Sequence, residues 1–373
     1  VCSSDLQSLR EMVQQLMSHE QTIVAPVARS TFSDALASGE RLKVLSALIP
    51  QLIQAARKIL PDRLAELVAG DRAVYALDGT YQKESAHYRR CTPREGGQDN
   101  PKGHALLSFY DVRLGCPCDV YVETRNQHEQ AMLRDYDRQA DALTRHKGAL
   151  WLVDRAFIDA AFWEKKNQKL KITMITLMKQ NLVIEKRDAL AVAALEQNEG
   201  VLSDEQIWLN SGQQLWRLIR YATPRGKTVE FLTNEHELEP GMIAFLYSRR
   251  WEEEKCFDTW KNDYAQAKAW GKKRRAIENQ ARLAVITSIL CAIFLYNNAG
   301  KYGQQDEKSI NKQQRREQQK DGGTDRPAWT AKLFRYTTKI SRQALRFLRF
   351  NLHKKYSHKR CREQLWPLLQ SYL

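Results

Sequence analysis

Tyr247-Ser-Arg-Arg250-Trp-Glu-Glu-Glu254-Lys-Cys-Phe-Asp-Thr-Trp-Lys261 is the stretch from which the rest of the chain is best interpreted. It follows a Pro-Gly pair and contains neither of these residues itself, so it is predicted to be helical. At about 100° per residue, one arc of roughly 60° on such a helix holds four functional side chains. They are Tyr247, Arg250, Glu254 and Lys261.

This arc has two interpretations. Surface helices often carry glutamate and lysine at three- and four-residue spacing as ordinary ion pairs in solvent. Alternatively, a carboxylate between two cations suits a helix that holds phosphates and places the carboxylate on a metal ion. The same geometry puts Glu252 on the far side of the helix and Glu253 outside the arc.

Composition points to a polyanionic partner. The chain has 373 residues, 43% of them hydrophobic, and a formal net charge of +15. A sizeable core is therefore possible, and nucleic acid is the default partner of so basic a protein. No apolar run reaches the roughly 20 residues that span a bilayer, so no membrane partner is expected. Seven scattered cysteines favour a reducing, cytoplasmic setting.

The pattern of apolar residues divides the chain into five regions. Residues 1–70 show helical spacing and are interpreted either as a DNA-binding module or as a packing subdomain. Residues 71–178 alternate short strands with helices near 127–146 and 157–167, and 179–240 are predicted to form a β-rich insertion. Residues 241–298 are helical and contain Glu254. Residues 299–373 end in a basic segment that we expect to serve dimerisation or DNA contact. Because the chain begins at Val1, we expect part of the native N-terminus to be missing.

Two short apolar runs in the second region each stop at an aspartate. Residues 73–77 precede Asp78, and residues 149–153 precede Asp154. Runs that are apolar on both faces are typical of strands in the middle of a sheet, and ligands gather at the carboxyl ends of such strands. Aspartates there also cap the next helix or turn. Each aspartate alone leaves both uses open, whereas the pair together with Glu254 favours a functional site.

The order of elements allows Asp78, Asp154 and Glu254 to converge at one edge of a mixed sheet in an α/β fold. Converging carboxylates repel one another unless hard cations lie between them, and Mg²⁺ binds a few carboxylates together with water and phosphate oxygens. Two such ions about 4 Å apart activate a water or a 3′-hydroxyl for in-line phosphoryl displacement. Three basic neighbours are expected to hold the scissile strand: Arg155, Arg250 and Lys261.

These motifs resemble those of the DDE transposases of bacterial insertion-sequence family four. That family carries its third acid in the signature Y-x-x-R-x-x-x-E-x-x-x-x-x-x-K, which is met at every position by Tyr247, Arg250, Glu254 and Lys261. Its first acid lies in D-G-[ST], matched by Asp78-Gly79-Thr80, and its second in D-R-[GA]-[FY], matched by Asp154-Arg155-Ala156-Phe157. The resemblance covers about residues 73–265. It implies an RNase H-like mixed-sheet catalytic core with a mostly β insertion, flanked by helical N-terminal and C-terminal regions.

The resemblance also implies an activity. Such a protein would bind the terminal inverted repeats of its own element as a homodimer, cleave the ends and join them to target DNA in the bacterial cytoplasm. Asp78, Asp154 and Glu254 would hold Mg²⁺, for which Mn²⁺ would substitute. Contacts to backbone phosphates would come from Tyr247, Arg250 and Lys261. Trp251 is a candidate to stack against a displaced base, and the candidates for the family's base-holding tryptophan are Trp208 and Trp216.

Three other interpretations compete with this one. A zinc site is suggested by His87, Cys91, His104, Cys116 and Cys118, although their spacing fits no tight knuckle pattern. A catalytically inactive DNA-binding relative is a second alternative, which the presence of all three acids disfavours. An RNase H-like nuclease is the third, and the long insertion and basic tail weigh against it.

Overall fold

A computed structural model describes residues 29–65, 67–68, 70–83, 103–123, 127–139, 142–209, 215–223, 227–262, 269–271 and 273–297. Residues 1–28 of the predicted helical region, the segment that contains His87 and Cys91, and the basic region 299–373 lie outside these residues.

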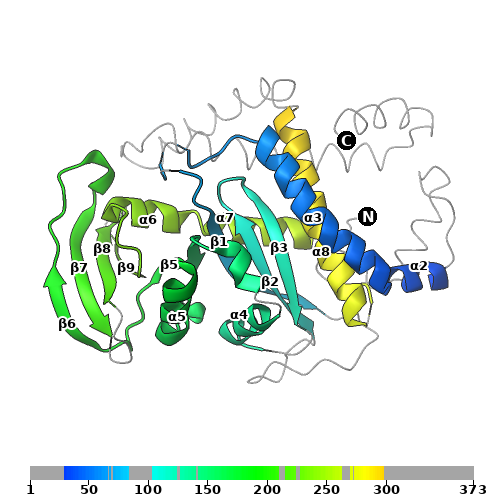
Figure 1. Ribbon diagram of the computed structural model, residues 1–373, viewed down its shortest axis with the longest axis horizontal. Coiled ribbons are helices and arrows are strands. Elements are labelled where there is room, and N and C mark those ends of the chain that lie inside the picture. The colour runs from blue at the N-terminus through cyan, green and yellow to red at the C-terminus, as the bar shows by residue number, and fades with distance from the viewer. Residues whose placement is uncertain are drawn as a thin grey trace.

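One mixed sheet of nine strands runs through the described part of the molecule, in the order β3-β2-β1-β4-β5-β9-β8-β7-β6 (Figure 1). The strands β1, β4 and β5 are parallel to one another, and the other neighbouring pairs are antiparallel. Their bounds are β1 Val74–Lys83, β2 Gly103–Asp111, β3 Cys116–Glu123, β4 Leu150–Val153, β5 Thr173–Leu177, β6 Ile184–Ala189, β7 Val201–Leu209, β8 Leu215–Ala222 and β9 Thr228–Thr233. This mixed α/β architecture with flanking helices is consistent with the RNase H-like core that the resemblance implies.

Helices cover the sheet. They are α2 Arg29–Leu36, α3 Gly39–Ile59, α4 Glu129–Arg138, α5 Ala160–Leu170, α6 Pro240–Ser248, α7 Trp251–Asn262 and α8 Arg274–Asn297, with short 3₁₀ turns η2 Ala142–His146, η3 Arg155–Phe157 and η4 Glu196–Asn198. In Figure 1, α3 and α8 lie side by side next to β3, and α4 and α5 lie together near the middle of the sheet.

The central strands are buried on both faces, and alternate side chains of β1 pack on opposite faces of the sheet. Tyr75 and Leu77 of β1 pack in the cluster that contains residues of α4 and α5. Val74 and Ala76 pack instead in the cluster that contains residues of α6. Because successive residues of a strand point to opposite faces, Asp78 follows Val74 and Ala76 onto the α6 face.

Several predicted bounds were wrong. The strand β1 continues to Lys83 instead of stopping at Asp78, because β2 pairs with it as far as Lys83↔Gly103. The helix predicted at 127–146 is two elements, α4 and η2, and the helix predicted at 157–167 is η3 followed by α5. The edge strand β6 was missed because five of its six residues are exposed, so it shows no apolar alternation.

The strands of region 179–240 extend the core's own sheet, since β9 pairs with β5. Arg217, which forms a buried ion pair with Asp204, also connects these strands to the chain that leads into α6. The guanidinium of Arg217 on β8 donates to both carboxylate oxygens of Asp204 on β7, at 2.8 and 2.5 Å, and to the carbonyl oxygen of Leu238 at 2.5 Å. The start of α6 is held similarly, because Asn198 donates to the Glu239 carboxylate and accepts from the backbone N–H of Gly241.

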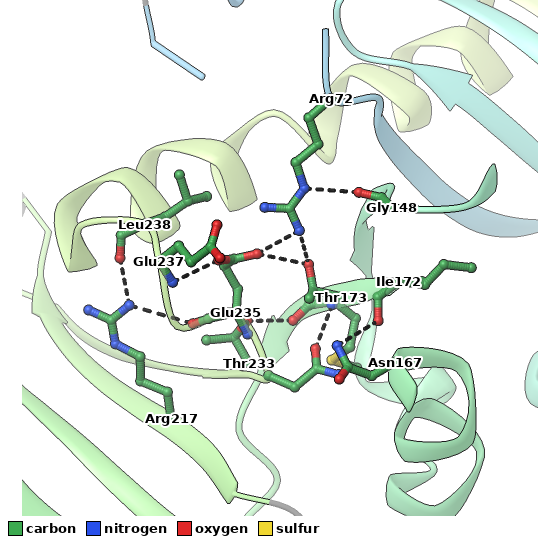
Figure 2. A network of polar contacts seen from close by, with 12 residues as sticks. Arg72, Gly148, Asn167, Ile172, Thr173, Arg217, Thr233, Glu235, Glu237 and Leu238 are labelled. Atoms are coloured by element: carbon green, nitrogen blue, oxygen red, sulfur yellow. Dashed lines mark hydrogen bonds and ion pairs between the residues drawn. The ribbon is translucent and has the colours of Figure 1, made fainter. Parts of the chain in front are cut away.

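A second network closes the edge of the sheet at which the parallel strands begin (Figure 2). Arg72, just before β1, donates to the Gly148 carbonyl just before β4 and forms a 2.6 Å ion pair with Glu235. Glu235 also accepts a hydrogen bond from Thr173 at the start of β5. Polar side chains therefore join the amino ends of three parallel strands, and the opposite edge is the one at which Asp78 and Asp154 lie.

The helix α8 contains a 21-residue segment, Arg274–Phe294, that is long and apolar enough to cross a membrane, and about half of its most apolar window is buried. It packs against α3 and β3. These contacts are those of a core helix.

Removing one partner of the buried pair Arg217–Asp204 is expected to cost far more stability than removing one partner of the exposed pair that Arg220 of the same strand makes. The side chains of Arg217 and Asp204 are 6% and 2% exposed, against 47% and 45% for Arg220 and Glu230. Asp204→Asn should lower the free energy of unfolding in urea by about 3–5 kcal/mol, because it leaves a buried cation without its counter-ion. Glu230→Gln, the matched control, should cost less than about 1 kcal/mol. Equal costs would contradict this account of how the inserted strands are held.

Candidate active site

Asp78 and Asp154 lie side by side on neighbouring parallel strands. The register of β1 and β4 runs from Val74↔Leu150 to Leu77↔Val153, and the two aspartates are the next residue on each chain. Neighbouring strands are about 4.8 Å apart. Ala76 and Leu152, two residues earlier, both face the α6 side of the sheet. The strand register thus brings the two predicted acids together on one face, at one edge.

The carboxylate of Asp78 is mostly buried and already has a cation beside it. Its Oδ1 accepts the backbone N–H of Gly79 at 2.9 Å, and its Oδ2 lies 3.4 Å from Nη1 of Arg250. Burial raises the pKa of Asp78 to about 6 although Arg250 lowers it, and Glu129 and Asp154 raise it further by repulsion. A carboxylate with this pKa is ionised only at a cost, which a bound cation removes.

Asp154 precedes η3 but makes no capping hydrogen bond with its side chain. Asp154 therefore does not cap the next turn, which was the structural role that the sequence left open. The next residue, Arg155, is exposed, and both residues are close enough to Tyr247 to affect its pKa.

The signature stretch is not one helix, as predicted, but two. The helix α6 ends at Ser248 and α7 begins at Trp251. At the junction, the backbone N–H groups of Arg249 and Arg250 donate to carbonyls three residues earlier, Leu246 and Tyr247. This tighter turn changes the helical phase, so the single 60° arc does not apply. The junction brings Arg250 against Asp78 on β1.

Two other members of the signature lie near the aspartates. Tyr247 is buried, with its ring 5.4 Å from that of Phe231 and 5.8 Å from the Arg250 guanidinium. Burial raises the pKa of Tyr247, Arg250 lowers it and Asp154 raises it. Lys261 is half-buried, and burial lowers its pKa against the attraction of Asp258 and Asp78. The structure therefore brings Arg250 and Lys261 near Asp78, and Tyr247 near Arg250 and Asp154.

The three consecutive glutamates of α7 have different surroundings. Glu252, predicted on the far side of the helix, is buried: it pairs with Arg63 at 3.1 Å and contacts the Tyr110 hydroxyl at 3.5 Å. Glu253 is fully buried. Burial and the negative charge of Asp78 raise its pKa well above the ordinary value, and the nearby Ser108 lowers it. Neither carboxylate oxygen of Glu253 has a hydrogen-bond partner among the described residues. Glu254 lies in α7, and its side chain is outside the described residues.

Sequence reasoning missed one acidic neighbour of the site, Glu129, the first residue of α4. Its carboxylate lies over Gly79: a Cβ on Gly79 would be 2.4 Å from Glu129 Oε1. Only a residue without a side chain leaves room for it there. The glycine in the Asp-Gly-Thr motif was the available signal, because a glycine inside a strand often marks a close approach.

The candidate base-stacking tryptophans differ in exposure. Trp216 is buried at 1% exposure and belongs to the hydrophobic core, so it is not available to a base in this structure. Trp208 on β7 is half-buried, and the ammonium of Lys186 lies 4.4 Å from its ring centroid. The side chain of Trp251 is outside the described residues.

The carboxylates fit a magnesium ion by their chemistry and placement. Asp78 and Asp154 are hard oxygen ligands in adjacent register, and the Arg250 guanidinium shows that Asp78 accepts a cation. Within the described residues, no three histidine, cysteine or acidic side chains are grouped closely enough to hold a metal. The side chain of Glu254, the third ligand of the predicted set, lies outside the described residues, and so do His87 and Cys91 of the zinc alternative.

The raised pKa of Asp78 predicts how the metal-free protein responds to pH. The pKa rises from 3.8 to about 6 on folding, so the folded state binds this proton more tightly than the unfolded state does. The stability that this tighter proton binding gives is fully present below about pH 4 and is lost as the pH rises through about 6. Relative to Asp78→Asn, the wild type should lose about 2–3 kcal/mol between about pH 4 and pH 7. Urea unfolding in EDTA measures this, and parallel pH profiles would contradict it.

The approach of Glu129 to Gly79 predicts a coupled effect on stability. Gly79→Ala should cost about 1–2 kcal/mol, because the new methyl group displaces the Glu129 carboxylate. In a Glu129→Ala background the same substitution should cost at least about 0.5 kcal/mol less. Urea unfolding of the four proteins in this cycle gives the coupling energy. Strictly additive costs would show that the two residues do not meet.

The known proteins to which this chain is similar include a protein family and a solved structure. A family profile described as "Transposase DDE domain" matches residues 69–290, more than half of the chain. No curated protein sequence matches. Among solved structures, the chain is similar to a piggyBac transposase synaptic complex with hairpin DNA, determined by cryo-EM, at 12% identity and a TM-score of 0.37.

That match covers 79% of this chain and 57% of the piggyBac chain, so the present protein spans little more than half of its length. The structural likeness is too distant to support an argument about function. The family profile, in contrast, begins before β1 and ends within α8, and so includes Asp78, Asp154 and the whole signature stretch. On this match, the chain belongs to the DDE transposase domain family.

Proposed function

We propose that this protein is the DNA transposase of an insertion sequence of family four, which cleaves the ends of its element and joins them to target DNA. The observation that carries the proposal is the register of β1 and β4, which sets Asp78 beside Asp154. The helix that bears Glu254 packs against β1. Membership of the DDE family implies phosphoryl transfer on DNA with a divalent metal.

The assignment to family four rests on the signature of α6 and α7. Tyr247, Arg250, Glu254 and Lys261 occupy its four defined positions. Among them, Arg250 contacts the first acid directly, Asp154 raises the pKa of Tyr247, and Asp78 raises the pKa of Lys261. Residues far apart in the chain thus form one group, which supports a common role.

In this proposal, Asp78, Asp154 and Glu254 hold Mg²⁺, or Mn²⁺ in its place. The metal would lower the pKa of an attacking water or 3′-hydroxyl and stabilise the leaving oxygen. The protein's own groups bind and orient the DNA. Arg250 and Lys261 are cations beside Asp78, and Arg155 is an exposed cation next to Asp154. Guanidinium and ammonium groups in these positions suit backbone phosphates.

Double-stranded DNA is the proposed partner, as transposon end and as target. The net charge of +15 favours such a polyanion. We further propose that two copies of the chain act together on the two ends of one element.

Glu254→Gln tests the third acid. On a duplex that carries the element's terminal repeat, the variant should lose at least about a hundred-fold in Mg²⁺-dependent cleavage, since one metal ligand is removed. Binding of the same duplex in EDTA should change little. The control is Glu230→Gln, which removes an exposed carboxylate of β9 and should cleave as the wild type does.

Two results would count against the proposal. Equal loss of DNA binding and cleavage in Glu254→Gln would make the glutamate structural. Cleavage by the wild type without joining of a pre-cut end to a supercoiled plasmid would instead indicate a nuclease of RNase H-like fold.

A further inference from the structure

The ion pair between Arg250 and Asp78 occupies a carboxylate that the proposed function assigns to a metal. Nη1 of Arg250 lies 3.4 Å from Oδ2 of Asp78, and the two side chains are 10% and 16% exposed. Oδ1 of the same carboxylate accepts the Gly79 N–H. In this state both oxygens of Asp78 have a partner within the protein.

We propose that Arg250 gates metal binding: its guanidinium holds Asp78 until a DNA phosphate draws it away, so that metal and DNA are bound together. The inference rests on the proposed function. It adds to that function an order of events, in which the arginine of the signature competes with the metal before it contacts DNA.

Electrostatics makes the two cations competitors. A guanidinium and a divalent ion on one small carboxylate repel each other strongly in a mostly buried site, where the effective dielectric constant is about 20. A partly buried carboxylate also gains more from a counter-ion than an exposed one does. The metal must therefore displace the guanidinium or bind more weakly while it remains.

A phosphate is a suitable alternative partner for Arg250. Guanidinium binds phosphate oxygens through two parallel hydrogen bonds, and it is weakly hydrated, which favours transfer between anions. The residue stands at the turn between α6 and α7, where neither helix fixes its backbone in a long hydrogen-bonded run. Because coupling between two ligands is reciprocal, DNA should then tighten metal binding as much as metal tightens DNA binding.

The other cations of the site do not share this position. Lys261 is half-buried, which lowers its pKa, and it is attracted more strongly by Asp258 than by Asp78. Arg155 is exposed and follows Asp154. Among the ion pairs of the described residues, the one to Asp78 is made by Arg250.

The test is a calorimetric titration of the full chain with Mn²⁺ without DNA, at about pH 8, where Asp78 is ionised. Arg250→Gln should bind Mn²⁺ about ten-fold or more tightly than the wild type, because the competing charge is gone. Arg250→Lys keeps a positive charge and should stay within about two-fold of the wild type. The control, Arg220→Gln, removes an exposed cation of β8 and should change the affinity by less than about three-fold.

Unchanged or weaker Mn²⁺ binding by Arg250→Gln would overturn the gate and leave Arg250 as a phosphate contact alone. Arg250→Met provides a second neutral variant with different packing if the glutamine variant does not fold. Asp78→Asn separates this result from the proposed function. If that variant binds Mn²⁺ as tightly as the wild type does, the metal site itself is wrongly assigned. If Asp78→Asn binds Mn²⁺ more weakly but Arg250→Gln does not bind it more tightly, only the gate is rejected.

Discussion

The parallel pairing of β1 with β4 is the constraint on which the rest of the site depends. It ends at Leu77↔Val153, and the next residue of each chain is an aspartate. Burial of the Asp78 carboxylate is unfavourable in the folded protein, and the negative charges of Glu129 and Asp154 nearby add to the cost. The pKa of Asp78, about 6, expresses that cost. Arg250 offsets part of it in the metal-free protein, and a metal ion would offset more.

The surrounding structure holds this unfavourable pair in place. At the opposite edge of the sheet, Arg72 and Glu235 join the beginnings of the parallel strands. On the α6 face, Glu252 anchors α7 through Arg63. The inserted strands contribute as well, because Asn198 holds the start of α6. Such restraints keep groups that repel one another at a fixed separation, which is a common source of local instability at functional sites.

Much of the core was predictable from sequence because its strands are apolar on both faces. The runs before Asp78 and Asp154 are of this kind, and they led directly to the first two acids. The break between α6 and α7 was not predictable, since no proline or glycine marks it. Burial of Glu252 and Glu253 was also missed, because a run of glutamates indicates solvent unless a partner such as Arg63, which pairs with Glu252, is known.

The central claim is that Asp78, Asp154 and Glu254 form one metal site. Anomalous diffraction from a crystal soaked in Mn²⁺ tests it most directly, because it locates the ion without reference to activity. The account predicts a peak between Asp78 and Asp154, with carboxylate oxygens of both about 2.0–2.2 Å away and Glu254 as a further ligand. A peak bound to neither aspartate, or an ion at the aspartates with Glu254 remote in the presence of bound DNA, would contradict it.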